Sequence, residues 1–263
     1  MIARPEKMRY QEAQHQWQAE AADNYTHLLD AQLFADRSLL GLIGNLTGKR
    51  ILDIGCGNGY LIRKIQASAL SVTGVDISEN MVQEAKRLGY GSAPSLLCVA
   101  SSDLLPLATG IYDAAICSLT INNLSSADMA KNTFREAGRI LKPGGLFVIS
   151  LPHPHTLSAI TRYRWTDWEE GQNQESLVPG EGFKRQIMGR DGSMISIVNY
   201  YWPKETLTNF AKRVGLELDT VSEETATVDE LARHPEELEP VFAEVPFFLV
   251  MRFVKRVGRP TRA

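Results

Sequence analysis

Short apolar runs alternate with amphipathic stretches between residues 50 and 151. The runs RILDIG, SVTGVDI, SLLCVAS, YDAAICS and GLFVISL have the length of strands. Between them, YLIRKIQASA, SENMVQEAKRLG and DMAKNTFREAGRIL space their apolar residues as helices do. Strands that are apolar along nearly their whole length are typical of a parallel sheet with helices on both faces. The pattern therefore predicts a doubly wound, mostly parallel α/β core over residues 50–151.

The segments on either side of this core have different patterns. Apolar residues at three- and four-residue steps from Gln11 to Ile43 predict N-terminal helices, and we interpret residues 1–49 as a helical cap. After Pro203 the sheet pattern resumes with the helix KETLTNFAKRVG and the strands LELDTVSEE and PFFLVMRFVK. Residues 203–263 are therefore expected to complete the core sheet and to end in a tail.

Residues 152–202 interrupt the alternation and are rich in proline and aromatic side chains. We interpret them as an insertion after the fifth strand. Within it, FKRQIMG and SMISIVNYYW are strand-like and are separated by the turn residues 190–192.

Composition narrows the class of protein. A chain of 263 residues buries enough surface to fold without disulfides, and its three cysteines are widely spaced with no CxxC pair. We therefore expect a reducing compartment and no structural zinc. The net charge of −3 offers no general attraction for nucleic acid. Neither a signal peptide nor a membrane-length apolar run is present, which favours a cytoplasmic protein.

The segment LDIGCGNGYL lies where the first strand should pass into its helix. Glycines there permit a sharp turn and a close approach of a ligand to the backbone, although tight turns also need glycine for structural reasons alone. A dinucleotide fingerprint would place its third glycine at Tyr60, one position after Gly59. Asp53, just before the turn, would repel a phosphate and attract an ammonium group. The turn thus favours a cofactor that carries an amino acid.

Asp76 ends the second predicted strand, 17 residues after Gly59. Asp53 and Asp76 should therefore project from the carboxyl edge of neighbouring strands, where an acid can accept hydrogen bonds from both hydroxyls of a ribose. The alternative is that Asp76 only precedes the helix that Ser78 caps. Together with Asp53 and the glycines, Asp76 predicts a nucleoside in the ligand.

These motifs resemble those of the class I S-adenosylmethionine-dependent methyltransferases. LDIGCGNGYL is similar to motif I of that family and VDIS to its acidic motif on the second strand. The resemblance runs from Arg50 to Leu151 and includes ASSDLLPL, YDAA and RILKPGG. It implies a Rossmann-like, seven-stranded sheet whose last strand, PFFLVMRFVK, is antiparallel. It also implies methyl transfer from S-adenosylmethionine to a nucleophile.

The resemblance also implies roles for individual residues. Asp53 would face the amino group of the cofactor, Asp76 would hold its ribose, and the loop that begins at Ser101 would contact the adenine, although the family often has an acid at that position. The expected cofactor-binding residues are Tyr25, Asp53, Gly55, Cys56, Gly57, Asn58, Gly59, Asp76, Ile77, Met81, Ser101, Ser102, Asp103, Ser118 and Leu119.

The insertion is where such proteins usually build the acceptor pocket. His153 leaves the carboxyl end of the fifth strand and is our candidate for a catalytic base, although a His-Pro pair is equally compatible with a turn. Similar proteins often carry histidine at the positions of Asn122 and Asn123. An asparagine side chain can form hydrogen bonds with a substrate or cofactor, but it cannot act as a general base. The expected substrate-binding residues are Asn122, His153, His155, Tyr200 and Trp202, although the aromatic side chains would equally form the insertion's own core.

The sequence thus predicts transfer of a methyl group to an O or N nucleophile of a small-molecule acceptor, in secondary or cofactor metabolism. No metal is expected, because no carboxylate cluster is evident. A non-catalytic S-adenosylmethionine-binding or scaffold protein, and a methyltransferase acting on protein or tRNA, are the alternatives. SLTINN stands where DNA and RNA base methyltransferases carry Asn-Pro-Pro-aromatic, which disfavours nucleic acid. Assembly as a homodimer is left open.

Overall fold

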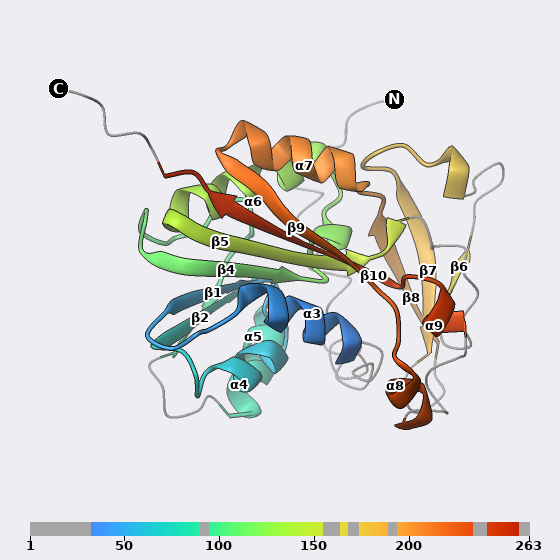
Figure 1. Cartoon of the computed structure of the whole chain (residues 1–263), viewed down its shortest axis with the longest axis horizontal. Helices are drawn as coiled ribbons and strands as arrows, with labels where there is room; N and C mark the ends of the chain where they lie inside the picture. Colours follow the sequence, from blue (N-terminus) through green and yellow to red (C-terminus); the bar gives the residue numbers. More distant parts are fainter. Residues whose placement is uncertain are drawn as a thin grey trace.

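A seven-stranded sheet forms the centre of the molecule (Figure 1). The computed structural model describes residues 33–89, 95–154, 164–167, 174–188, 194–233 and 241–257. The strand order is β3-β2-β1-β4-β5-β10-β9. The strands are β1 (Arg50–Ile54), β2 (Ser71–Asp76), β3 (Ser95–Val99), β4 (Tyr112–Ser118), β5 (Leu141–Pro152), β9 (Leu216–Glu224) and β10 (Phe248–Lys255).

The direction of the strands confirms the predicted fold class. Strands β3, β2, β1, β4 and β5 pair in parallel, whereas β10 runs antiparallel to both of its neighbours, β5 and β9. The sheet order reverses between β1 and β4, so that the loops after these strands diverge to opposite sides. Ligands of open α/β sheets bind in the crevice at such a point.

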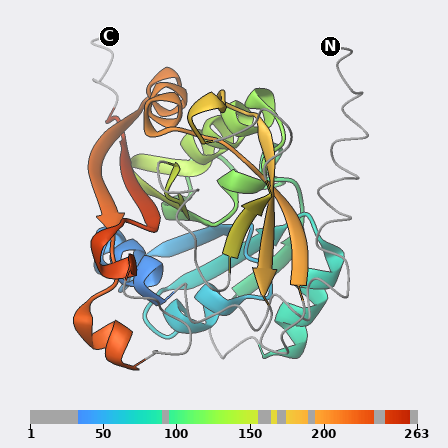
Figure 2. The same ribbon diagram turned by 90° about the vertical axis from the view of Figure 1, so that its right-hand side faces the viewer.

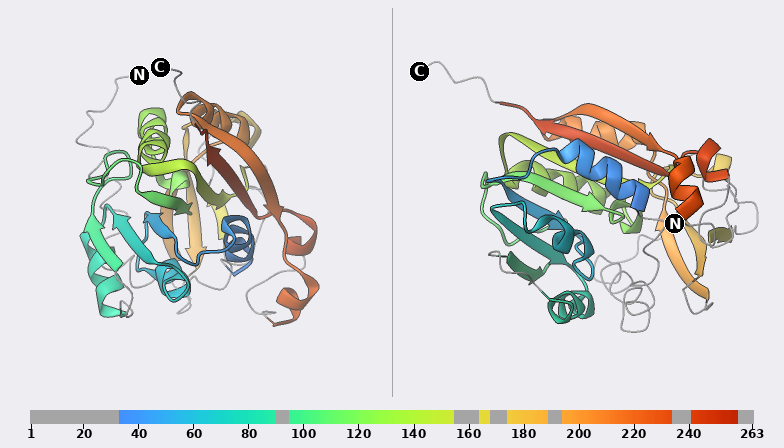
Figure 3. Two further views of the ribbon diagram at one scale, coloured as in Figure 1. Left: turned by 60° about the vertical axis from the view of Figure 1, so that its left-hand side comes forward. Right: turned by 60° about the horizontal axis from the view of Figure 1, so that its bottom comes forward.

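Helices cover both faces of the sheet (Figures 1 and 3). On one face, α6 (Ala127–Ile140) and α7 (Lys204–Arg213) pack into the larger apolar core. On the other, α3 (Leu33–Ile43) and α4 (Tyr60–Ile65) pack into a second core, and α3 lies across β5, β9 and β10. Helix α5 (Glu79–Arg87) packs on β2 and β3 and begins at Ser78, whose hydroxyl accepts from the Met81 N–H. The predicted helices from residue 11 to residue 32 lie outside the described residues.

A second, three-stranded antiparallel sheet lies between β5 and α7 in the chain and at one end of the large sheet (Figure 2). It consists of β6 (Arg164–Asp167), β7 (Gly182–Met188) and β8 (Met194–Tyr200). Strands β7 and β8 coincide with the two predicted strands, while the predicted turn at residues 190–192 lies outside the described residues. Strand β8 contacts the 3-10 helix η2 (Ile121–Asn123), which follows β4.

Four short elements complete the described fold: η2, η4 (Gln174–Ser176), α8 (Val228–Arg233) and α9 (Val241–Glu244). None of the helices in the described ranges is long and apolar enough to cross a membrane.

Three phenylalanines lie in contact with one another inside the larger core. Phe134 of α6 meets Phe147 of β5 and Phe253 of β10 edge to face, at centroid distances of 5.4 and 5.7 Å. All three side chains are fully buried. Such aromatic pairs add specific stabilisation to the burial of apolar area.

We predict that Phe134→Ala destabilises the protein by about 3–5 kcal/mol, because it leaves a cavity between α6 and the sheet. Urea denaturation measures the change in the free energy of unfolding. Val228→Ala, at an exposed position on α8, should change it by less than about 0.5 kcal/mol. Equal effects of the two substitutions would contradict this account of the core.

Candidate functional site

Glycines shape the turn between β1 and α4. Gly55, Gly57 and Gly59 all have positive φ, at 73°, 53° and 76°. A Cβ on Gly55 would lie 2.1 Å from the Thr120 hydroxyl oxygen, whereas a Cβ on Gly57 would meet no atom within 4 Å. Gly55 is therefore required by packing against the loop after β4, and Gly57 borders open space.

The Asp76 carboxylate, at the end of β2, fixes this turn from the side. Its Oδ2 accepts from the Gly57 N–H at 2.8 Å, and its Oδ1 accepts from the Ser78 N–H at 2.9 Å. Burial raises the pKa of Asp76, and the backbone N–H groups of Ser78, Gly57 and Ile77 oppose that rise. Because a carboxylate oxygen accepts more than one hydrogen bond, both oxygens retain capacity for a ligand's hydroxyls.

Asp53 on β1 is a buried acid, only 2% exposed. No side-chain or backbone donor within the described residues hydrogen-bonds to its carboxylate. Burial, together with the charges of Asp76 and Asp36, raises its pKa from 3.8 to about 8. A buried carboxylate with two acidic neighbours and no basic partner is well suited to receive a cation.

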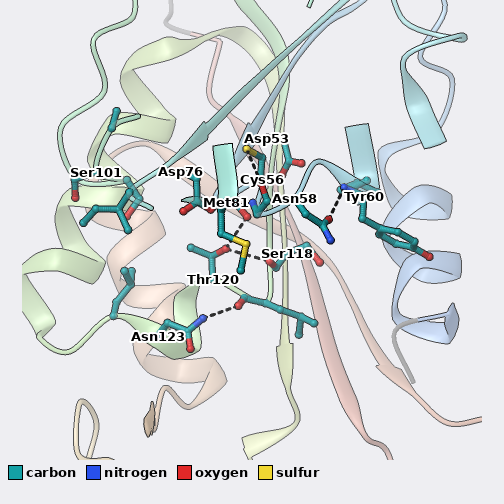
Figure 4. A pocket seen from close by; sticks show the side chains of 18 of the residues that line it. Asp53, Cys56, Asn58, Tyr60, Asp76, Met81, Ser101, Ser118, Thr120 and Asn123 are labelled. Carbon is teal, nitrogen blue, oxygen red and sulfur yellow. Dashed lines mark hydrogen bonds between the residues drawn. The ribbon is translucent and has the colours of Figure 1, made fainter. Parts of the chain in front are cut away.

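These residues open onto a cavity of about 1100 Å³, its mouth included. Figure 4 shows Tyr60 and Ser101 on opposite sides, with Asp53 and Asp76 between them. The described residues that line it include three carboxylates and no basic side chain. They are Asp36, Asp53, Gly55, Cys56, Gly57, Asn58, Tyr60, Leu61, Asp76, Ile77, Met81, Ala100, Ser101, Ser102, Ser118, Leu119, Thr120, Asn123, Leu124 and Met129.

The cavity brings together most of the expected cofactor-binding residues, with three exceptions. Gly59 lies behind the turn, where a Cβ would be 3.2 Å from that of Ala85 on α5. Asp103 is a buried residue of the loop after β3, and its Oδ1 accepts from the Ser101 hydroxyl at 2.5 Å. Neither residue lines the cavity. Tyr25 lies outside the described residues.

Several lining residues were absent from the predicted set. Tyr60 and Leu61 follow the glycine turn directly, and Thr120 and Asn123 follow Ser118, so chain proximity pointed to them. Asp36 of α3 carried no such signal. It is held in the wall by Lys64 of α4, whose Nζ lies 2.9 Å from its Oδ2.

Helix α3 is also tied to the far end of the sheet. The Arg37 guanidinium donates to both carboxylate oxygens of Glu230, each at 2.8 Å, and to Glu224 at 3.0 Å. The two Arg37 nitrogens thus bond to two different carboxylates, which restricts the orientation of the guanidinium as well as its distance. The helix that presents Asp36 to the cavity is thus fixed between α4 and α8.

A second, much smaller hollow, about 230 Å³ with its open mouth included, lies between the carboxyl end of β5 and the small sheet. Three of the expected substrate-binding residues, Asn122, Tyr200 and Trp202, line it. His155 lies outside the described residues.

His153, the candidate base, lines neither cavity. Its neighbours Pro152 and Pro154 line the second cavity, but its own imidazole is buried with Nε2 at 3.6 Å from Glu223 of β9. The backbone N–H of His153 donates to the Phe247 carbonyl at 2.8 Å. The assignment of His153 as a base therefore stays a prediction.

Comparison with known proteins relates the residues around the cavity to a known domain family and to solved structures. Residues 52–149, which supply much of its lining, match the family model of a methyltransferase domain. A solved S-adenosylmethionine-dependent methyltransferase from Mesorhizobium loti superposes with a TM-score of 0.63 at 26% identity, over 86% of this chain and 98% of that one.

Residues 52–149 form a methyltransferase domain. It has the Rossmann-like fold of the S-adenosylmethionine-dependent class. The domain carries the glycine turn, Asp53 and Asp76, whereas Asp36 and the small sheet lie outside it.

Curated relatives share the methyltransferase domain rather than the whole chain. A malonyl-[acyl-carrier protein] O-methyltransferase from Buchnera aphidicola is 30% identical over 131 residues, 50% of this chain and 51% of the relative. A ubiquinone biosynthesis O-methyltransferase from Chromobacterium violaceum is 29% identical over 103 residues, 38% of this chain and 43% of the relative. The chain thus spans about half the length, or less, of these relatives.

The raised pKa of Asp53 predicts a pH-dependent gain in stability for Asp53→Asn. Between pH 3.8 and about 8, the unfolded chain ionises Asp53 while the folded protein keeps its proton, so wild-type stability falls as the pH rises through this window. Asparagine does not titrate. Its advantage in thermal denaturation should therefore be larger at the upper end of the window than at the lower end, by at least about 2–4 °C.

Val228→Ala, at an exposed position without a titratable group, supplies the control for this prediction. Its effect on thermal denaturation should not grow with pH. A constant difference between Asp53→Asn and wild type at all pH values would show that Asp53 ionises normally in the folded protein.

Proposed function

We propose that this protein transfers a methyl group from S-adenosylmethionine to an O or N nucleophile of a small-molecule acceptor. The observation that carries the proposal is the cavity over the glycine turn, which three carboxylates and no basic side chain line among the described residues. S-adenosylmethionine presents an ammonium and a sulfonium, so this charge pattern favours it and disfavours a dinucleotide pyrophosphate. The names of the relatives support the same chemistry.

Asp53 and Asp76 would bind two different polar groups of the cofactor. The Asp53 carboxylate, which has no donor among the described residues, would take the ammonium group. The oxygens of Asp76 would accept from the ribose hydroxyls while keeping their bonds to Gly57 and Ser78. The methionine portion would then lie on the Tyr60 side of the cavity and the adenine on the Ser101 side (Figure 4).

The bound cofactor would supply an electrophilic methyl group on a positively charged sulfur. The protein's own residues would orient it and exclude water, which accounts for much of the catalysis of an in-line displacement. Asp53 binds best as the carboxylate, so cofactor binding would draw a proton from it wherever it is protonated beforehand.

The acceptor would come from the side of the insertion, where Asn122, Tyr200 and Trp202 line the second cavity. We further propose that the protein acts in the cytoplasm on metabolites rather than on nucleic acid. Residues 1–49 would form a cap and residues 152–202 an acceptor-binding insertion.

Asp76→Ala should weaken binding of S-adenosylhomocysteine by about tenfold or more, because it removes hydrogen bonds from a charged acceptor to the ribose and releases the Gly57 N–H. Calorimetry measures the dissociation constant. Asp219→Ala, on the exposed side of β9, is the matched control and should bind as wild type does. Unchanged affinity in a folded Asp76 variant would refute the ribose assignment.

Turnover separates an enzyme from a binding protein of the same fold. Incubation with a metabolite extract and isotopically labelled methyl donor should yield a labelled small molecule that mass spectrometry identifies. Label found only in protein or tRNA would redirect the proposal to those acceptors. Tight cofactor binding with no labelled product from any extract would favour a non-catalytic role.

A further inference from the structure

The loop after β4 places a strained residue in the wall of the larger cavity, the one over the glycine turn. Leu119 lines this cavity and has φ 51°, and among the described residues it is the one non-glycine with a positive φ. A leucine rarely adopts the left-handed region, and such strain persists only where the surroundings impose it. The wall of the cavity therefore depends on the contacts that hold Leu119 in this conformation.

The conformation of Leu119 determines how the loop packs against the glycine turn. The next residue, Thr120, also lines the cavity, and its hydroxyl oxygen lies 3.4 Å from the Gly55 carbonyl oxygen. On the other side, the Leu119 side chain packs against an apolar cluster made of Ala226, Phe247 and Phe248. A change of φ at Leu119 would displace both side chains and with them this part of the wall.

Two hydrogen bonds restrain the backbone of Leu119. Its N–H donates to the Ser150 carbonyl of β5 at 2.8 Å. Its carbonyl accepts from the Asn123 Nδ2 at 2.9 Å, a bond drawn in Figure 4. The second bond restrains the peptide group that joins Leu119 to Thr120, so it acts directly on the strained part of the loop.

The small sheet orients the side chain that makes this second bond. A carbonyl only accepts, so Asn123 presents its NH₂ group to Leu119 and its oxygen to Asn199 of β8, whose Nδ2 donates at 3.0 Å. The Asn122 Nδ2 lies farther from the same oxygen, at 3.4 Å. Asn199 is 1% exposed and does not line the larger cavity. Its connection to Leu119 runs through the amide of Asn123.

We propose that Asn199 is a positioning residue for the cofactor site: through Asn123 it holds Leu119 in the left-handed conformation that completes the cavity wall. This inference rests on the proposed function, which makes the cavity the site of S-adenosylmethionine. It gives the small sheet a part in cofactor binding, in addition to its proposed part in binding the acceptor. Without the donor of Asn199, a fraction of the molecules would lose the left-handed conformation, and the affinity would fall by that fraction.

A pair of substitutions tests this connection through the affinity for S-adenosylhomocysteine, measured by calorimetry. Asn199→Ala should weaken binding by about three- to tenfold, the loss expected for one hydrogen bond. In a protein that already carries Leu119→Gly, the same substitution should change the affinity by less than about twofold. Glycine adopts a positive φ without strain and no longer needs the restraint. The comparison is valid whatever Leu119→Gly alone does to binding.

Ile197→Ala is the matched control. Ile197 lies on the same face of β8 as Asn199 and is also buried. Its truncation removes apolar contacts of the small sheet but leaves the donor of Asn199 in place. It should therefore change the affinity for S-adenosylhomocysteine by less than about twofold.

Hydrogen exchange of the Leu119 N–H, followed by NMR, gives a second measurement that needs no ligand. Asn199→Ala should lower the protection of this amide by about three- to tenfold, because the loop leaves its bond to Ser150 more often. The decrease should again be absent in the protein that carries Leu119→Gly.

Equal losses of affinity with and without Leu119→Gly would overturn the inference, since Asn199 would then act by another route. Equal losses from Ile197→Ala, or an Asn199→Ala variant with wild-type affinity and protection, would overturn it as well. Failure of the proposed function has a different signature, because the wild-type protein would then not bind S-adenosylhomocysteine. Hydrogen exchange would still decide whether Asn199 holds the loop.

Discussion

The carboxylate of Asp76 joins two parts of the chain on which the site depends. It accepts from the N–H of Gly57 in the turn after β1 and from the N–H of Ser78 at the start of α5. The left-handed backbone at Gly55 and Gly57 is what brings the Gly57 N–H to this acid. Because Gly55 also packs against Thr120, the loops after β1, β2 and β4 form one unit around the cavity.

The charged side chains that line the cavity in the described structure are all acidic. Asp53, Asp76 and Asp36 face the cavity, and of these only Asp36 is paired with a cation, Lys64, in the described structure. Burial of unpaired acids is unfavourable for folding, as the raised pKa of Asp53 shows. Under the proposed function, a bound cation at this position would offset that loss of stability.

The sheet and the cofactor side of the site could be predicted from the sequence because their signals are local. Strands β1 to β5 contain mostly apolar residues, and Asp53, Gly55, Gly57 and Asp76 fall within two short motifs. Asp36 could not be found in this way, since its place in the cavity depends on packing of α3 across strands more than 100 residues later in the chain. The orientation of His153 likewise depends on β9, which brings Glu223 to its imidazole.

The position of β10 has a consequence for synthesis on the ribosome. Strand β9 pairs with β10 alone within the large sheet, and β10 lies between β9 and β5. Until residues 248–255 have emerged, β5 presents an open edge and β9 has no partner strand in that sheet. The order of translation therefore leaves completion of the large core, including the burial of Phe253 against Phe134, to a step after β10 has been made.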